Sequence, residues 1–72
     1  MHWGCGYGLY EAKTDLFTYV VTKQWRRGEQ MWFAFMQHND EHHLKEVPGP
    51  LPLNRRQAKR NCEEHAKEYS ND

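Results

Sequence analysis

The segment from Leu16 to Trp25 constrains the fold of this chain more than any other, because seven of its ten residues are β-branched or aromatic. Its side chains alternate between two faces, as a strand requires. One face carries Phe17, Tyr19, Val21, Lys23 and Trp25, and the other carries Thr18, Val20, Thr22 and Gln24. A period of two with polar residues on one side is typical of a strand in a sheet with one half-exposed face.

Two further strands are expected beside this one. Residues 7–13 alternate as a first strand, and Thr14 and Asp15 supply a short turn. The segment 26–29 predicts a hairpin loop in which Gly28 takes a positive φ. Residues 30–38 follow as a third strand with apolar side chains on both faces, which places it at the centre of a sheet or between two covering layers.

A helix over residues 54–69 closes the chain. Asn54 is expected to cap it, Gln57 to complete a capping box, and Leu53 to pack against Ala58 as a hydrophobic staple. A narrow apolar stripe follows at helical spacing: Ala58, Cys62, Ala66 and Tyr69, with His65 beside them. Residues 1–6 are predicted to be a loose lead, and residues 39–53 a loop broken by three prolines. The predicted fold is α+β: a three-stranded antiparallel β-meander followed by one C-terminal helix (βββα).

Composition limits the class of protein. Seventy-two residues make one small domain, and an aromatic content of 14% argues against disorder. No apolar run approaches the roughly 18 residues that span a bilayer, and the N-terminus does not resemble a signal peptide. A cytoplasmic protein without membrane contact is expected. Equal numbers of acidic and basic side chains give a net charge of zero, so no global field attracts nucleic acid or membrane.

The cysteines and histidines carry two metal-site alternatives. His2 with Cys5, and Cys62 with His65, have the spacing of a tetrahedral zinc site. The stronger interpretation places Cys62 in the apolar stripe and His2 in a frayed terminus, with free thiols and no metal or cofactor. A second histidine group could bind a metal or respond to pH, although polar surface explains it more simply: His38, His42 and His43, with Asp40.

Catalytic motifs are not evident. Neither cysteine lies in a recognisable catalytic sequence. The glycines at positions 4, 6 and 8 precede a strand, whereas a dinucleotide-binding loop follows a strand and opens a helix. We therefore expect a protein that is not an enzyme.

The charges of the helix run against its macrodipole. Its first half holds Arg55, Arg56, Lys59 and Arg60, and the following residues hold Glu63, Glu64, Glu68 and Asp72. Cations at a helix N-terminus cost about 0.3–1 kcal/mol per group in the end turns. A bound anion, an acidic partner or acidic residues elsewhere could offset that cost, or the charges could simply form a solvated face.

Aromatic side chains are more numerous than one narrow helix can cover. The two predicted sheet faces carry Phe17, Tyr19, Trp25, Trp32, Phe33 and Phe35. Either Trp3, Tyr7 and Leu51 fold over the second face, or that face binds a second copy or another protein.

Two resemblances bear on function. The segment Arg55-Arg56-Gln57-Ala58-Lys59 after a β-meander is similar to the second half of double-stranded-RNA-binding domains, which implies phosphate contacts at Arg55, Arg56 and Lys59, with Arg26 and Arg27 as a second patch. The whole layout, an aromatic meander followed by a helix with Ala58, Lys59, Cys62, Glu63 and His65, resembles small accessory proteins of phages and prophages. Such proteins often bind and block a host enzyme or defence complex.

The sequence thus predicts a small binding protein, of the phage inhibitor kind, that occludes the working site of a host protein or complex. Its contact residues are expected at the hairpin tip and at the helix start: Trp25, Arg26, Arg27, Arg55, Arg56, Lys59 and Arg60. A homodimer through the aromatic sheet face would be compatible with this function. The alternative function is direct nucleic-acid binding through the basic helix start.

Overall fold

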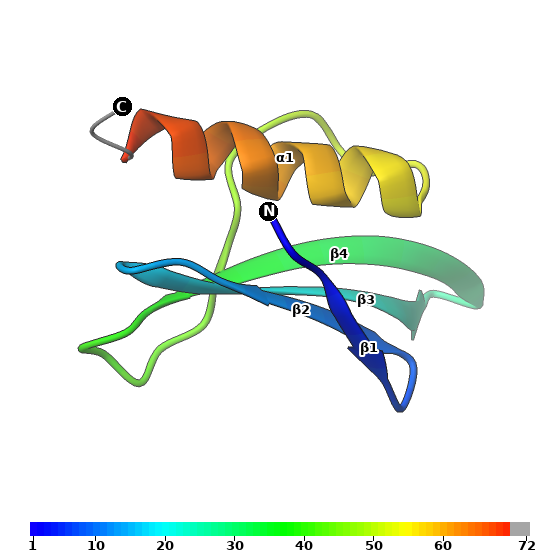
Figure 1. The fold of residues 1–72 in the computed structure, drawn as a ribbon. Helices are drawn as coiled ribbons and strands as arrows, with labels where there is room; N and C mark the ends of the chain where they lie inside the picture. Colours follow the sequence, from blue (N-terminus) through cyan, green and yellow to red (C-terminus); the bar gives the residue numbers. More distant parts are fainter. Residues whose placement is uncertain (70–72) are drawn as a thin grey trace.

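A computed structural model describes residues 1–69 of the chain, so Asp72 lies outside the described residues. Its elements are β1 (Gly4–Gly6), β2 (Leu9–Lys13), β3 (Phe17–Arg26), β4 (Glu29–His38), β5 (Lys45–Glu46) and α1 (Arg55–Glu68). The strands form one antiparallel sheet in chain order, and α1 crosses one face of it (Figure 1). Within residues 1–69, the other face has no helix over it.

The predicted α+β class and the C-terminal helix are confirmed, but the prediction of three strands is wrong because residues 1–69 form five. The lead at residues 1–6 contains β1, which turns back onto β2 through Tyr7 and Gly8 at φ values of 52° and 77°. The long loop contains β5, which pairs with the end of β4. Both added strands are short edge strands of low β-propensity, held in place by turn geometry and by their neighbours.

The β3–β4 hairpin is the longest element of the sheet. Its strands pair without interruption from Phe17 with His38 to Arg26 with Glu29. Arg27 and Gly28 form the two-residue turn at φ values of 54° and 79°, the geometry of a type I′ turn. The expected positive φ of Gly28 is therefore confirmed, and Arg27 shares it.

The core lies between β3, β4 and the small side chains of the helix. Tyr19, Val21 and Ala34 on the sheet are buried against Ala58 and Cys62. Because these helix residues are small, α1 can lie close to the sheet. Larger, partly buried rings pack around this contact, among them Trp3, Tyr10, Phe17 and Trp32.

One polar pair is built into this core. The Tyr19 hydroxyl and His65 Nδ1 are hydrogen-bonded at 2.7 Å, and both side chains are buried. The His65 ring also meets Phe17 and Tyr69 at centroid distances of 4.9 and 4.7 Å. Burial raises the pKa of the Tyr19 phenol to about 12 and lowers the pKa of His65, the latter opposed by the Glu68 carboxylate.

The loop that leads to the helix is fixed by Asn61, a buried residue that the sequence did not single out. Asn61 Nδ2 donates to the Pro50 carbonyl at 2.8 Å, and Gln57 Nε2 donates to Asn61 Oδ1 at 2.8 Å. Gly49 takes a φ of 142°, and a Cβ atom there would lie 3.0 Å from the Asn61 side chain. The glycine thus allows the loop to approach the helix closely.

The helix start agrees with the sequence in part. Asn54 is the N-cap, and its Oδ1 accepts from Gln57 N at 2.8 Å. The expected capping box is wrong, because the Gln57 amide bonds to Asn61 instead of reaching back to Asn54. The expected staple is also wrong: Leu53 is 82% exposed, so it does not cover Ala58.

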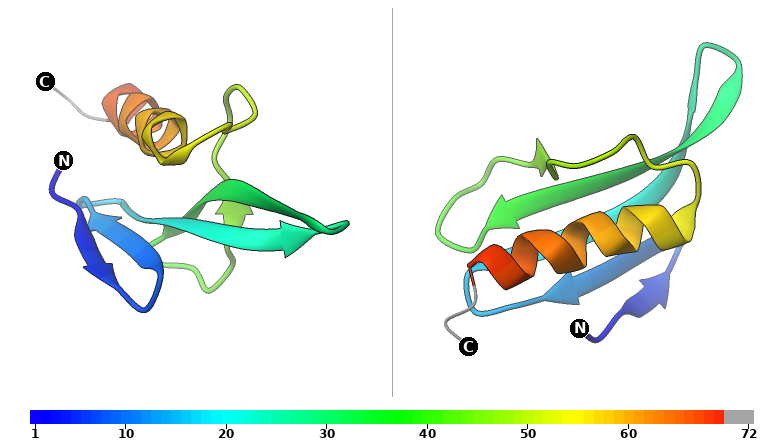
Figure 2. Two further views of the ribbon diagram at one scale, coloured as in Figure 1. Left: turned by 90° about the vertical axis from the view of Figure 1, so that its right-hand side faces the viewer. Right: turned by 90° about the horizontal axis from the view of Figure 1, so that it is seen from above.

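The far end of the β3–β4 hairpin extends past the rest of the sheet. Pairing with β2 ends at Thr22, so no described residue forms a strand beside Lys23–Arg26 on that side. Pairing with β5 involves Phe35 and Met36, so none forms a strand beside Glu29–Phe33 on the other side. This two-stranded arm, residues 23–32, projects beyond the helix start in the right-hand view of Figure 2.

The N-cap yields a stability prediction. Asn54→Ala should lower the free energy of unfolding by about 0.5–2 kcal/mol, because the Gln57 N–H loses its acceptor. Asn54→Asp keeps the acceptor and adds a negative charge at the helix N-terminus, so it should not destabilise the protein. Denaturant titrations measure both values. Identical midpoints for Asn54→Ala and the wild type would show that the cap contributes nothing.

The buried histidine yields a pH prediction. Since His65 has a lowered pKa in the folded protein, the unfolded chain binds more protons once the pH drops below about 6.5. The free energy of unfolding should therefore fall as the pH is lowered through that value. Denaturant titrations between about pH 7 and pH 5 should show a smaller fall for His65→Gln. The exposed His43→Gln serves as the control and should behave as the wild type; an unchanged slope in His65→Gln would refute this assignment.

Candidate protein-binding surface

The charges of this electrically neutral chain are separated along its long axis, which measures 40 Å against 22 and 20 Å. Seven of the ten Lys and Arg residues lie in the arm or in the first half of α1: Lys23, Arg26, Arg27, Arg55, Arg56, Lys59 and Arg60. Six of the ten acidic residues lie towards the opposite end of the molecule: Asp15, Asp40, Glu41, Glu63, Glu64 and Glu68. The arm and the helix start are at the same end in Figure 1.

The hairpin tip presents an exposed aromatic side chain between cations. Trp25 is 70% exposed and lies on the face of β3 that also carries Tyr19 and Val21, beyond the start of the helix. The Arg26 guanidinium lies over the Phe33 ring on the opposite face, 5.0 Å from its centroid. Arg27 occupies the turn itself, in a backbone conformation that costs a non-glycine residue roughly 1–2 kcal/mol.

Two of the cations at the helix start lie against aromatic rings. Arg55 donates to the Tyr10 hydroxyl at 2.7 Å, with its guanidinium 5.1 Å from the centroid of that ring. Lys59 Nζ lies 4.4 Å from the Tyr10 centroid and 5.4 Å from that of Trp3. Each such contact contributes about 0.5–1 kcal/mol at an exposed site, similar to the dipole cost of a cation in the first turn. Contacts with Tyr10 and Trp3 thus offset the dipole cost of these two cations. From the sequence, the expected sources of this offset were a bound anion, an acidic partner or acidic residues elsewhere.

The remaining two helix cations differ. Arg60 Nε forms an exposed ion pair with Glu64 Oε1 at 3.3 Å. Within residues 1–69, Arg56 makes no side-chain hydrogen bond, ion pair or cation–π contact, and it is exposed. Arg56 and Arg27 are therefore the cations at this end whose charge is most available to a partner.

Two leucines in the loop before the helix are also exposed. Leu51 and Leu53 are 63% and 82% exposed, in the loop between Pro50 and the helix start. Leu51 and Arg26 line the same groove, of about 320 Å³. We define the tip surface as Trp25, Arg26, Arg27, Leu51, Leu53, Arg55 and Arg56. The sequence indicated its aromatic and basic members; the leucines were missed because Leu53 was assigned to a staple and Leu51 to the second sheet face.

The aromatic surplus is smaller than composition indicated. Of the six sheet aromatics, Trp25 alone is largely exposed, and Phe33 is buried beneath Arg26 on the uncovered face. Of the two alternatives for this face, the one in which Trp3, Tyr7 and Leu51 cover it is wrong. Trp3 packs on the helix side, and the other two are exposed.

The four residues of the zinc alternative are not brought together. Cys62 and His65 are buried in the core, His65 on Tyr19, whereas His2 and Cys5 are exposed. His38 Nδ1 lies 4.0 Å from Asp40 Oδ2, while His42 and His43 are exposed. Across the described part of the chain, no three His, Cys, Asp or Glu side chains gather as metal ligands.

Comparison of the chain with protein families, curated proteins and solved structures finds no match. No helix within residues 1–69 is long and apolar enough to cross a membrane.

The strained turn gives a prediction that separates the effect of backbone strain on stability from the effect of the Arg27 charge. Arg27→Asn should raise the free energy of unfolding by about 1 kcal/mol, because Asn tolerates the left-handed conformation better than Arg. Arg27→Gln removes the same charge but keeps the strain, and it should unfold as the wild type does. Thermal and denaturant unfolding of both variants measure the difference. Equal stability of the two variants would mean that the turn stores no strain.

Proposed function

We propose that this chain is a small binding protein whose tip surface docks onto an acidic surface of a protein partner. The observation that carries the proposal is the exposure of Trp25, Leu51 and Leu53 among the arginines at one end of the molecule. Trp and Arg are the residues that most often dominate interface energetics, and exposed apolar side chains among cations supply the two kinds of group that such an interface uses.

The leucines favour a protein over a nucleic acid. Phosphate and sugar groups are polar and give an aliphatic side chain little to pack against, whereas the apolar centre of a protein interface buries it. The cations also fit this reading. Arg55 and Lys59 lie against aromatic rings, and Glu64 pairs with Arg60, so a nucleic-acid backbone laid along α1 would meet fewer free cations than the sequence suggests.

The resemblance to phage and prophage accessory proteins suggests how such docking would act. The partner would be a host enzyme or defence complex, and the bound chain would cover its working site. An acidic working-site entrance would attract the basic end of the chain before contact, and Trp25 with the leucines would then be buried. No catalytic step is part of this proposal.

Affinity capture from bacterial lysate, with and without nuclease, tests the proposal. We expect acidic proteins to be retained by the wild type despite nuclease and to be lost with Trp25→Ala and with Arg56→Glu. Lys13→Glu reverses a charge where β2 ends at the β2–β3 turn, at the opposite end of the molecule from the tip surface, and should retain them. Retention by all variants would place the contact elsewhere on the molecule.

Fluorescence anisotropy with duplex DNA, duplex RNA and single strands tests the alternative function, which is direct nucleic-acid binding. At about 150 mM salt, nonspecific binders reach dissociation constants of roughly 10⁻⁴–10⁻⁶ M. We expect no tighter binding here. Submicromolar binding to any of these nucleic acids, lost in Arg56→Glu, would replace the protein partner by nucleic acid.

A further inference from the structure

We propose that copies of this chain associate head to tail, with Trp25 of one copy entering a hollow at the opposite end of the next copy. This inference concerns a second copy of the chain and does not depend on the partner proposed above. It rests on three features: an open hollow lined with apolar groups, the separation of charge along the molecule, and an arm that carries an exposed tryptophan.

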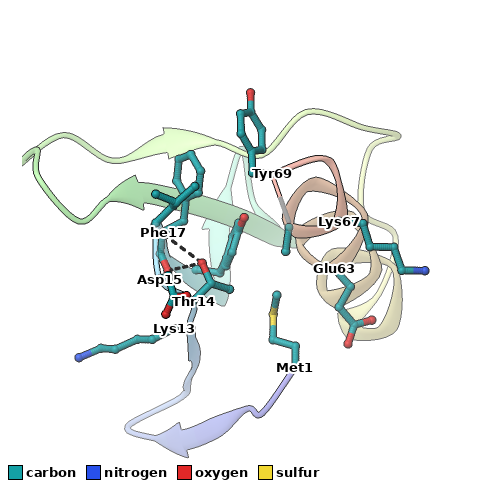
Figure 3. A pocket seen from close by; sticks show the side chains of 11 residues that line it. Met1, Lys13, Thr14, Asp15, Phe17, Glu63, Lys67 and Tyr69 are labelled. Carbon is teal, nitrogen blue, oxygen red and sulfur yellow. Dashed lines mark hydrogen bonds between the residues drawn. The ribbon is translucent and has the colours of Figure 1, made fainter. Parts of the chain in front are cut away.

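The hollow lies between the β2–β3 turn and the last turns of α1 (Figure 3), with a volume of about 780 Å³. Its lining contains the apolar groups Met1, Leu16, Phe17, Tyr19, Ala66 and Tyr69. Met1, Leu16 and Tyr69 are substantially exposed, so their surface is available to another molecule. In Figure 3, Phe17 lies on the sheet side and Glu63 and Lys67 on the helix side, while Tyr69 stands at the end of the helix between them.

The end of the molecule around the hollow is opposite in charge to the tip surface. The lining itself is not acidic, because Asp15 and Glu63 lie there with Lys13, Lys67 and the amino group of Met1. The acidic side chains gather around it: Asp40 and Glu41 follow Asn39, which is hydrogen-bonded to the β2–β3 turn, and Glu68 ends the helix. The arm and helix start at the other end carry Arg26, Arg27, Arg55 and Arg56. Two molecules stacked end to end therefore bring opposite charges together, whereas two molecules joined at like ends would repel each other.

The arm can deliver a side chain into such a hollow. Residues 23–32 have no strand on either side, and Trp25 is 70% exposed near the tip. Insertion would move an exposed indole out of water and against the rings of Phe17 and Tyr69. Buried aromatic anchors of this kind dominate interface energetics.

Such an interface joins two different surfaces, so it need not close into a dimer. When two copies join, one uses its arm and the other its hollow, so the pair still has one free hollow and one free arm. Repeated contacts of this kind give short open chains or a ring. An association through the uncovered sheet face would instead be symmetric and stop at two copies. The two arrangements make different predictions for variants.

Sedimentation velocity and light scattering of the full chain test the proposal. At an ionic strength of about 0.01 M, where screening is weak, the average mass should rise with protein concentration above that of the monomer, and salt should reverse the rise. Trp25→Ala should remain monomeric under the same conditions. Glu63→Arg, which places a bulky cation in the hollow, should also remain monomeric. A wild type that stays monomeric at millimolar concentration and low salt would overturn the proposal.

Mixing the two variants gives the sharper result. Trp25→Ala keeps an intact hollow, and Glu63→Arg keeps an intact arm, so an equimolar mixture should form a one-to-one heterodimer and nothing larger. A symmetric interface could not be restored in this way. A mixture that remains monomeric, or either variant that still associates alone, would overturn the proposal.

Two controls exclude trivial explanations. Glu64→Arg makes the same charge reversal on the neighbouring helix residue, which does not line this hollow, and should associate at least half as strongly as the wild type. Circular dichroism should show that every variant is folded. A loss of association in Glu64→Arg equal to that in Glu63→Arg would refute the hollow as the binding site, since overall charge would then be sufficient. None of these outcomes depends on finding the protein partner.

Discussion

The close contact of Ala58 and Cys62 with Tyr19 and Val21 is the interaction on which the rest of the structure depends. Side chains this small leave room for the helix to lie near the sheet, but they cannot fill the space at its flanks. Large rings occupy that space: Trp3 before β1, Tyr10 of β2, Phe17 of β3 and Trp32 of β4. Two of these rings, Tyr10 and Trp3, also face cations of the helix, so core packing and surface charge are linked there.

The placement of charge follows from that arrangement. Cations in the first turns of a helix are unfavourable on their own, and here Tyr10 and Trp3 compensate for two of them. The fold can therefore keep a basic helix start without an anion bound there. The molecule therefore has a basic end and an acidic end, although its net charge is zero.

The sequence predicted those elements whose own residues favour the secondary structure that they adopt. β3 and β4 have strong β-propensity, and the helix has a capping residue and a stripe, so both were foreseen. β1 and β5 were missed because their stability comes from Tyr7, Gly8 and neighbouring strands, not from their own residues. Asn61 was missed because its role requires Gly49 and Pro50 beside it, which no helical spacing reveals. The basic residues of the site were predicted, but their partners in the fold and the exposed leucines were not.

The neighbour-by-neighbour pairing of the sheet has a kinetic consequence. Every strand pairs with the strand that precedes it in the chain, and two of the connections are two-residue turns. Hairpins of this kind close over short loops and form on the microsecond scale, about 1–10 μs. The contact between Tyr19 and His65 spans 46 residues and requires the ordered loop at Gly49. The sheet should therefore form first and the helix dock last, with helix docking as the slow step that completes the core.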